Sequence, residues 1–186
     1  PIFEKTAKEK DAPKSIASQK RQVTDWDWEK NELVIEVAEE HHTDHKIYNL
    51  DLPGIYQTKN LLTVLEACSQ LQQLGWKIND EQIHKGLKQT KKLTGLHGRW
   101  EIIHHSPLVV LDVAHNIDGI KQLVEQAEVT EHRQLHIVIG MVKDKEVEKV
   151  LAQLPKNALY YFTKAQIPRA LPEDELMEKA LTAGLY

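Results

Sequence analysis

The chain has 186 residues, of which 41% are hydrophobic and 28% are charged, and its formal net charge is -4 at neutral pH. Such a chain can build one ordinary domain or two small ones with a hydrophobic core, and the composition is not that of a disordered protein. The weakly negative charge argues against nucleic acid or an acidic membrane as the main partner. We therefore expect no nucleic-acid partner and no membrane partner.

The single cysteine, Cys68, falls on the apolar side of an expected helix. It has no partner for a disulfide within the chain and is expected to pack as a small hydrophobic residue, which suits a reducing compartment. We find neither an apolar run near the ~18 residues of a membrane span nor a basic-then-apolar leader, so the expected location is the cytoplasm. Because the chain begins at Pro1 and ends just after a helix, we expect a portion of a longer protein.

The first elements in chain order are a helix over residues 1–11 and a short strand over residues 14–18. In "LVIEV" at 33–37 and "KIYNLDL" at 46–52, apolar residues recur at every second position, which is typical of half-exposed strands. These two segments are expected to form a hairpin.

The loop of this hairpin, "EEHHTDH", combines histidines and carboxylates, including His41 and His42. Imidazole and carboxylate groups are good metal ligands, so a metal site is one interpretation. Adjacent histidines seldom aim at one ion, and we favour a solvated loop.

From Gln57 onward the apolar residues follow a helical period, and Gly75 is well placed to end this helix. A second helix is expected over residues 80–90 with Asp80 as its cap. The glycines of "KLTGLHG" then interrupt both periodicities and indicate a linker. We place a domain boundary here, giving domains at 1–93 and 94–186.

The second domain is expected to alternate continuous apolar strands with helices. That order predicts an α/β fold with a doubly wound, mostly parallel sheet covered on both faces, preceded by the α+β end of another domain. The expected elements are strands at 100–105 and 107–114, a helix at 117–127, a strand at 135–140, a helix at 145–154, a strand at 158–163 and a helix at 173–183.

Polar groups follow the strands of this expected sheet, where open parallel sheets bind ligands. Asp112 ends a core strand, and His115 and Asn116 follow at the start of a helix. Asp112 could simply hold the turn and Asn116 could cap the helix, but burying an ionisable group is costly, so we favour function for the acid and histidine. The helix start also favours a bound anion.

Three further residues are candidates with strong alternatives. Asp144 fits a helix cap, and Lys145 is either an exposed lysine of the first turn or a functional one. Arg99 is either a surface arginine or a clamp for a ligand shared by both domains. No G-x-x-x-x-G-K-[ST] loop and no G-x-G-x-x-G motif is present.

Several motifs together resemble those of a known family. "LPGIYQTKNLLTVLEA", then "GRWEII…PLVVLDVAHN", then "GMVKDKE" are similar, in order and spacing, to the folylpolyglutamate synthase and dihydrofolate synthase family of the Mur ligase superfamily. The resemblance implies a C-terminal portion of such an enzyme, with residues 1–93 ending an ATP-binding domain and residues 94–186 forming most of a Rossmann-like domain. The chain departs from the family at two positions: the family commonly has histidine where this chain has Tyr56, and proline where it has His97.

The resemblance also implies roles for individual residues. Gln57 and Asn60 correspond to residues that meet the adenine, and Arg99 to an arginine near the phosphates. Asp112 corresponds to an acid that holds the ribose. His115 matches a histidine near the phosphates and glutamate, and Lys145 a basic residue that receives the glutamate carboxylate.

The implied reaction activates a carboxylate as an acyl phosphate, which the amine of L-glutamate attacks. The implied cofactors are ATP and Mg²⁺, and the substrates are folate or dihydropteroate and L-glutamate. The phosphate loop and the metal ligands are expected upstream of Pro1. This chain then supplies no metal ligand and is expected to be inactive alone. The full-length enzyme is expected to be a monomer. A cell-wall Mur ligase and a non-catalytic Rossmann-like binding module are the alternatives.

Overall fold

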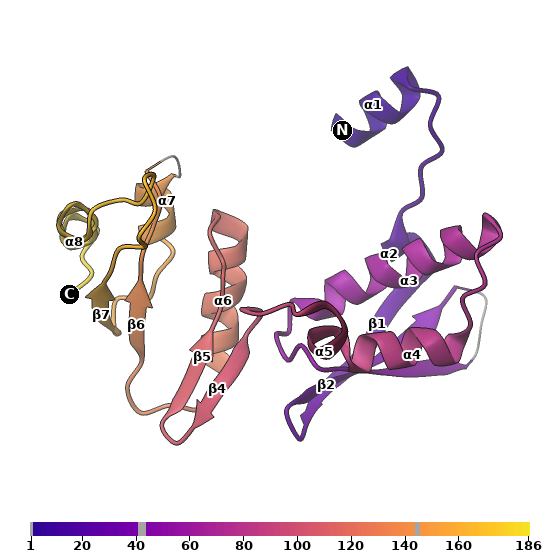
Figure 1. Ribbon diagram of the computed structural model, residues 1–186, viewed down its shortest axis with the longest axis horizontal. Helices are drawn as coiled ribbons and strands as arrows, with labels where there is room; N and C mark the ends of the chain where they lie inside the picture. The colour runs from indigo at the N-terminus through magenta and orange to yellow at the C-terminus, as the bar shows by residue number, and fades with distance from the viewer. Residues whose placement is uncertain (1, 41–43, 144–145) are drawn as a thin grey trace. The chain divides into compact units, whose positions relative to one another are not determined.

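The computed structural model describes residues 2–40, 44–143 and 146–186. Contacts divide the chain into unit 1, residues 1–101, and unit 2, residues 102–186 (Figure 1). This division lies a few residues beyond the expected boundary between residues 93 and 94, which stays a prediction. No helix within the described residues is long and apolar enough to cross a membrane.

Unit 1 contains a three-stranded antiparallel sheet in the order β1-β2-β3. The strands are β1 (Arg21–Glu29), β2 (Glu32–Glu39) and β3 (His45–Leu50). The expected hairpin is therefore confirmed as β2 and β3, with Ile35 opposite Tyr48. β1 was not expected from the sequence.

Two short helices precede this sheet. The first, α1 (Ile2–Glu9), agrees with the expected helix at 1–11. The second, α2 (Ala17–Lys20), lies where a strand was expected at 14–18, so that prediction was wrong. The chain joins the sheet at Arg21, where β1 begins to pair with β2.

Helices α3 (Gln57–Gln73) and α4 (Asp80–Lys88) cover one face of the sheet, and the short helix α5 (Thr90–Thr94) follows (Figure 1). Alternate residues of β2 and β3 point to this face and form a core with α3 and α4. The fully buried members are led by Leu33, Ile35 and Leu61. The period-2 strands and the period-3.6 helices therefore share one apolar interior.

The ends of α3 and α4 follow familiar cap chemistry, with one correction. Gly75 adopts φ 91° just after α3, a left-handed conformation that glycine accepts without strain. The cap of α4 is Asn79, not Asp80. Asn79 Oδ1 accepts the Gln82 N–H at 2.8 Å, and Gln82 Oε1 accepts the Asn79 N–H at 2.9 Å. This reciprocal pair places Asp80 inside the first turn.

Buried Glu66 on α3 ties the start of β1 to the helix. Its Oε1 accepts hydrogen bonds from Lys20 Nζ and Ser15 Oγ, both at 2.7 Å, and its Oε2 accepts one from Arg21 Nη1 at 2.9 Å. Burial alone would raise the pKa of this carboxyl, but these bonds, with one from Gln70, lower it to about 2. Glu66 is therefore charged and multiply paired.

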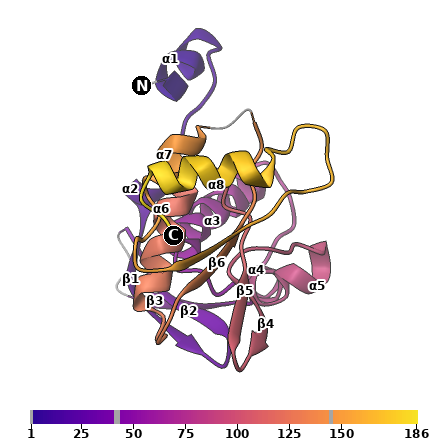
Figure 2. The same cartoon turned by 90° about the vertical axis from the view of Figure 1, so that its left-hand side faces the viewer.

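Unit 2 alternates strands and helices in the expected order, as Figure 2 shows from a second direction. β6 and β7 pair in parallel, and β4 and β5 form a separate two-stranded sheet. The mixed α/β class is thus confirmed, with the described parallel pairing confined to β6 and β7. The elements are β4 (Glu101–His105), β5 (Leu108–Leu111), α6 (Ile117–Val129), β6 (His136–Ile139), α7 (Val147–Leu151), β7 (Leu159–Phe162) and α8 (Glu173–Thr182).

The core of unit 2 lies between its helices and one face of the β6–β7 pair. Leu151, Leu176 and Leu185 are almost fully buried there. On β6 and β7, alternate residues point away from this core, and Val138 is 71% exposed and Tyr161 48% exposed. The expectation that helices cover both faces is therefore not met by the described residues of this strand pair.

Candidate functional site

The first turn of α3 holds two of the predicted site residues together. Gln57 is buried, and Asn60 Nδ2 donates a hydrogen bond to Gln57 Oε1 at 2.9 Å. Residues three apart on a helix share a face, which explains this contact. Gln57 Nε2 and Asn60 Oδ1 take no part in that bond, so the pair offers one amide donor group and one carbonyl acceptor.

Gly54 lies in the turn before α3 and against the ring of Tyr56. A Cβ at Gly54 would lie 2.7 Å from the Tyr56 ring, closer than real Cβ atoms approach another heavy atom. The Gln57 N–H donates to the Gly54 carbonyl at 2.9 Å and closes the turn. This turn leads directly into the helix that carries Gln57.

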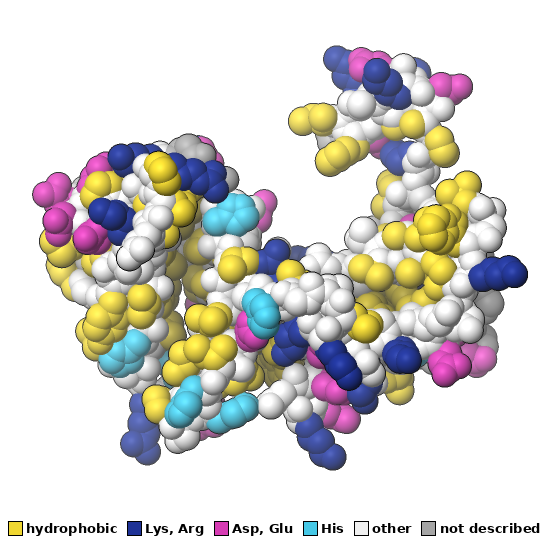
Figure 3. All heavy atoms as spheres, viewed as in Figure 1, with side chains coloured by type: hydrophobic (Ala, Val, Ile, Leu, Met, Phe, Trp, Pro, Cys, Tyr) yellow, Lys and Arg dark blue, Asp and Glu magenta, His cyan; other side chains and the backbone are white. Residues whose placement is uncertain are grey.

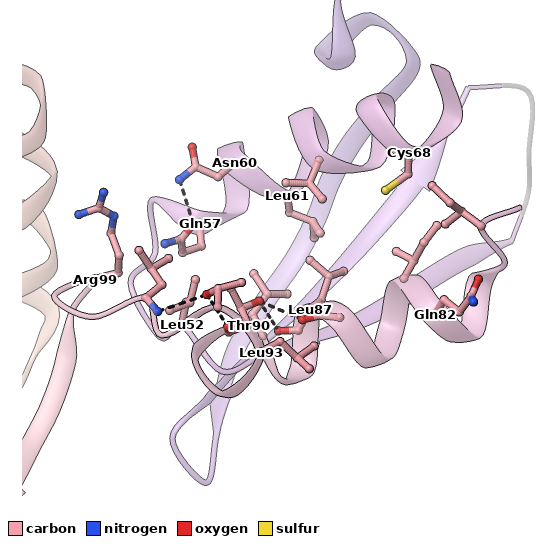
Figure 4. A pocket seen from close by; sticks show the side chains of 17 residues that line it. Leu52, Gln57, Asn60, Leu61, Cys68, Gln82, Leu87, Thr90, Leu93 and Arg99 are labelled. Atoms are coloured by element: carbon pink, nitrogen blue, oxygen red, sulfur yellow. Dashed lines mark hydrogen bonds between the residues drawn. The ribbon is translucent and has the colours of Figure 1, made fainter. Parts of the chain in front are cut away.

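A cavity of about 520 Å³ lies beside α3, α4 and α5 within unit 1 (Figure 4). Most of its lining side chains are apolar, such as Leu61, Val64, Ile83 and Leu87. Gln57, Asn60 and Arg99 line one end, as Figure 4 shows, while Cys68 and Gln82 line the other. Three of the predicted site residues therefore share one cavity, which sequence analysis did not foresee.

Arg99 lies in a loop whose shape is fixed by Glu101. Glu101 Oε2 accepts the Gly98 N–H at 2.9 Å, and Glu101 Oε1 is 2.9 Å from His97 Nδ1. The backbone bond from Gly98 and the contact with His97 lower the pKa of the Glu101 carboxyl. Arg99 Nη1 donates to the Gly98 carbonyl at 3.3 Å, and no carboxylate among the described residues pairs with its guanidinium.

Glu101 is a residue of the candidate site to which the sequence analysis assigned no role of its own. The signal was present in the G-R-x-E motif, where the acid stands three residues after the glycine. At that spacing a carboxylate can accept the glycine N–H and close the loop on itself. Glu101 therefore acts on the neighbouring backbone, and a ligand-binding role for Arg99 stays a prediction.

In unit 2, Asp112 and Asn116 both hold backbone groups. Asp112 Oδ1 accepts the Ala114 N–H at 2.8 Å, and Asn116 Oδ1 accepts the Gly119 N–H at 2.8 Å. Asn116 is thus the N-cap of α6, the role that the sequence suggested for it. The bond from the Ala114 N–H shows that Asp112 holds the turn, as one interpretation of the sequence suggested. Its role in binding a ligand stays a prediction.

His115 lies between them with its side chain exposed. Its Nδ1 is 3.0 Å from the Val113 carbonyl, which can only accept, so Nδ1 carries the proton of this contact. In a neutral ring Nε2 then carries no proton and can act as an acceptor. The local fold therefore leaves the His115 side chain exposed to solvent.

The remaining predicted residues are not brought to a described site. Asp144, Lys145, His41 and His42 lie outside the described residues. Within the described part of the chain, no three His, Cys, Asp or Glu side chains form a group that could hold a metal ion. The named candidates thus comprise Gln57, Asn60 and Arg99 in unit 1, and Asp112 and His115 in unit 2.

Comparison with known proteins places this geometry in a family. Residues 98–184, which include Arg99, Asp112 and His115, match the family described as "Mur ligase, glutamate ligase domain". The probable bifunctional folylpolyglutamate synthase/dihydropteroate synthase of Haloferax volcanii is 31% identical over 136 residues, 72% of this chain and 15% of that protein. The dihydrofolate synthase/folylpolyglutamate synthase of Escherichia coli is 30% identical over 159 residues, 84% of this chain and 33% of that protein.

A solved structure shares the fold over nearly the whole chain. It is the Mycobacterium tuberculosis folylpolyglutamate synthase complexed with ADP and AMPPCP, with a TM-score of 0.80 at 21% identity. The match covers 98% of this chain and 40% of that one. The chain therefore spans less than half the length of each of these relatives. Together these matches show that the chain belongs to the Mur ligase superfamily, in its folylpolyglutamate synthase and dihydrofolate synthase family.

Proposed function

We propose that this chain is the C-terminal portion of an ATP-dependent ligase that adds L-glutamate to the carboxylate of a folate or of dihydropteroate through an acyl phosphate. The observation that carries the proposal is the family match over residues 98–184, which spans the Arg99 loop and the turn from Asp112 to Asn116. Residues 1–93 are the end of the ATP-binding domain in this proposal, and residues 94–186 are most of the glutamate ligase domain.

In unit 1, Gln57 and Asn60 meet the adenine, and Arg99 meets the phosphates. The hydrogen bond between the two amides supports this assignment because it fixes their orientation before a nucleotide binds. The groups left over are one donor and one acceptor, which is the pattern an adenine edge requires. The Glu101 contacts hold the loop while leaving the Arg99 guanidinium without a carboxylate partner among the described residues.

In unit 2, Asp112 binds the ribose and His115 acts near the phosphates and the incoming glutamate. The exposed side chain of His115 supports this role, since an imidazole whose Nδ1 donates to a carbonyl can act as a base at Nε2. Lys145 receives the glutamate carboxylate in this proposal, as a cation suits an anionic group.

Mg²⁺ would neutralise the phosphate charge during phosphoryl transfer. The described residues contain no group of three His, Cys, Asp or Glu side chains that could hold it, and the sequence contains no phosphate loop. We therefore assign the metal ligands and the loop to another part of the enzyme. The chain alone is inactive and binds ATP weakly in this proposal, and the complete enzyme is a cytoplasmic monomer.

A chimera tests the function directly. It joins this chain to the part of the Escherichia coli relative that the chain does not cover, and the assay follows phosphate release with ATP, Mg²⁺, a folate substrate and glutamate. We expect release that requires both the folate substrate and glutamate. Release with a muramyl peptide substrate instead would assign the chain to the cell-wall ligases.

The sharpest variant pair in this chimera is His115→Gln against His132→Gln. Both histidines are exposed, and each places Nδ1 near the carbonyl two residues earlier, at 3.0 Å for His115 and 2.7 Å for His132. Loss of a general base costs about a hundredfold or more in rate. We expect that loss for His115→Gln and an unchanged rate for His132→Gln, and equal rates in the two variants would refute the role of His115.

A further inference from the structure

The cavity of unit 1 extends well beyond Gln57 and Asn60, which line one of its ends. Cys68 follows Asn60 by eight residues on α3, which is about 12 Å along a helix axis. Both residues line the cavity, and Figure 4 shows Arg99 and Gln57 at one end with Cys68 and Gln82 at the other. The contacts proposed for adenine occupy only the first end, so most of the cavity has no assigned ligand.

The lining determines what this space can hold. Among the described residues, Arg99 is the one ionised side chain that lines it, and the walls between Arg99 and Cys68 are mainly leucine, isoleucine and valine. A volume of about 520 Å³ is within the range of small-molecule sites, about 300–1,000 Å³. The phosphates of ATP carry several negative charges, so they would not lie along the apolar wall between Arg99 and Cys68.

We propose that this cavity binds an elongated aromatic monoanion, with its acid group at Arg99 and its rings between α3 and α4. One cation at one end matches one anionic group, and the apolar walls match an uncharged ring body. Such a ligand overlaps the end lined by Gln57 and Asn60. It therefore competes with any nucleotide bound there, although its binding does not depend on the proposed ligase activity.

Gly86 on α4 lines the cavity without placing a side chain in it. It lines the cavity from the interior of a helix, and a Cβ added there meets nothing within 4 Å. Glycine inside a helix is less favourable than alanine. A larger side chain at residue 86 would enter empty space, so substitution there fills the cavity without a clash at Cβ.

Cys68 supplies a reporter at the far end, because it is the only cysteine in the sequence. Its thiol is half-buried, so alkylation by N-phenylmaleimide reports access to that end. The probe ligand is biphenyl-4-carboxylate, and the matched neutral compound is biphenyl-4-carboxamide. Mass spectrometry of the 186-residue chain gives the alkylation rate, and calorimetry gives the affinity of each compound.

We expect biphenyl-4-carboxylate to slow alkylation of Cys68 about tenfold at saturation. The carboxamide and the variant Arg99→Gln should each weaken binding about tenfold, the effect of one charge-assisted hydrogen bond. Gly86→Leu should abolish both binding and protection, whereas Gly86→Ala should keep both. Val64→Phe fills the cavity from the α3 wall and replaces Gly86→Leu if circular dichroism shows that variant to be unfolded.

Three results would overturn the proposal. One is binding of the carboxylate that leaves the Cys68 rate unchanged, since the ring body would then lie elsewhere. Another is protection that persists in folded Gly86→Leu and Val64→Phe. The third is protection by ATP but not by biphenyl-4-carboxylate, which would assign the whole cavity to the nucleotide.

Discussion

Arg21 Nη1 donates a hydrogen bond to Glu66 Oε2 at 2.9 Å, joining the first residue of β1 to the middle of α3 across 45 residues of sequence. Arg21 Nε also donates to Glu39 Oε1 at 3.1 Å, so one guanidinium connects β1, β2 and α3. Both Arg21 and Glu66 side chains are largely buried. An arginine held by two carboxylates in this way fixes the position of α3 on the sheet.

Replacing Glu66 should therefore destabilise unit 1. Glu66→Ala leaves Arg21 without one carboxylate in a largely buried position, at a cost of roughly 2–4 kcal/mol in the free energy of unfolding. The control is Glu81→Ala, an exposed acid on α4, which should change stability by less than about 0.5 kcal/mol. Urea unfolding measures both, and equal effects would show that the Glu66 contacts contribute nothing specific.

The same carboxylate predicts an acid dependence of stability. The pKa of Glu66 is lowered from 4.5 to about 2 because its hydrogen bonds outweigh the effect of burial. A depressed folded pKa stabilises the fold above the unfolded pKa, and this stability is lost as the pH falls from about 4.5 towards about 2. The difference in unfolding free energy between the parent chain and Glu66→Ala should shrink over that window, and a constant difference would contradict the assignment.

Asn116 should act as a cap and not as a ligand residue. Asn116→Ala removes the acceptor for the Gly119 N–H and should destabilise unit 2 by about 1 kcal/mol. Asn116→Ser keeps a capping oxygen and should recover most of that loss. Thermal unfolding followed by circular dichroism compares the two. Equal losses for alanine and serine would exclude the cap as the source of stability.

For Asp112, two substitutions separate binding from folding. In the chimera, Asp112→Ala should raise the KM for ATP about ten- to a hundredfold, since a charge-assisted bond to a ribose hydroxyl is lost. Asp112→Asn keeps an oxygen for the Ala114 N–H but removes the charge. We expect Asn to retain the native circular dichroism spectrum and still raise the KM. If Asp112→Ala unfolds and Asp112→Asn leaves the KM unchanged, the residue only holds the turn.

Lys145 should affect glutamate more than ATP. In the chimera, Lys145→Ala should raise the KM for glutamate about tenfold or more, because a cation that pairs with the amino-acid carboxylate is removed. Lys143→Ala, two residues earlier, is the matched control and should leave that KM near its parent value. A larger change in the KM for ATP than for glutamate would remove Lys145 from the glutamate site.

Much of unit 2 could be predicted from continuous apolar strands alternating with helices, but β1 could not. Its apolar residues Val23 and Trp26 are three apart, so they break the period of two that marks a strand. The structure explains this, since the pairing with β2 shifts between Val23 and Asp25, and the bulge returns both side chains to one face. A local pattern cannot reveal a bulge that only the partner strand defines.

The sequence could identify candidate site residues, but it could not predict the cavity that they line. The motifs singled out Gln57, Asn60 and Arg99, yet their common cavity depends on α4 and α5, which contribute Gly86 and Leu93 from distant sequence. In the same way, the one-residue shift from Asp80 to Asn79 at the cap of α4 was decided by the reciprocal bond with Gln82. Both outcomes depend on contacts that composition and periodicity do not encode.

The division of the chain at residue 101 also separates its chromophores. All four tryptophans, Trp26, Trp28, Trp76 and Trp100, belong to unit 1, whereas unit 2 contains tyrosines and no tryptophan. Trp26 and Trp28 meet edge to face with ring centroids 5.0 Å apart. Tryptophan emission therefore reports the unfolding of unit 1, and unit 2 contributes no tryptophan signal to a melting curve recorded in this way. The unfolding of unit 1 can thus be followed within the whole chain, without an added dye or label.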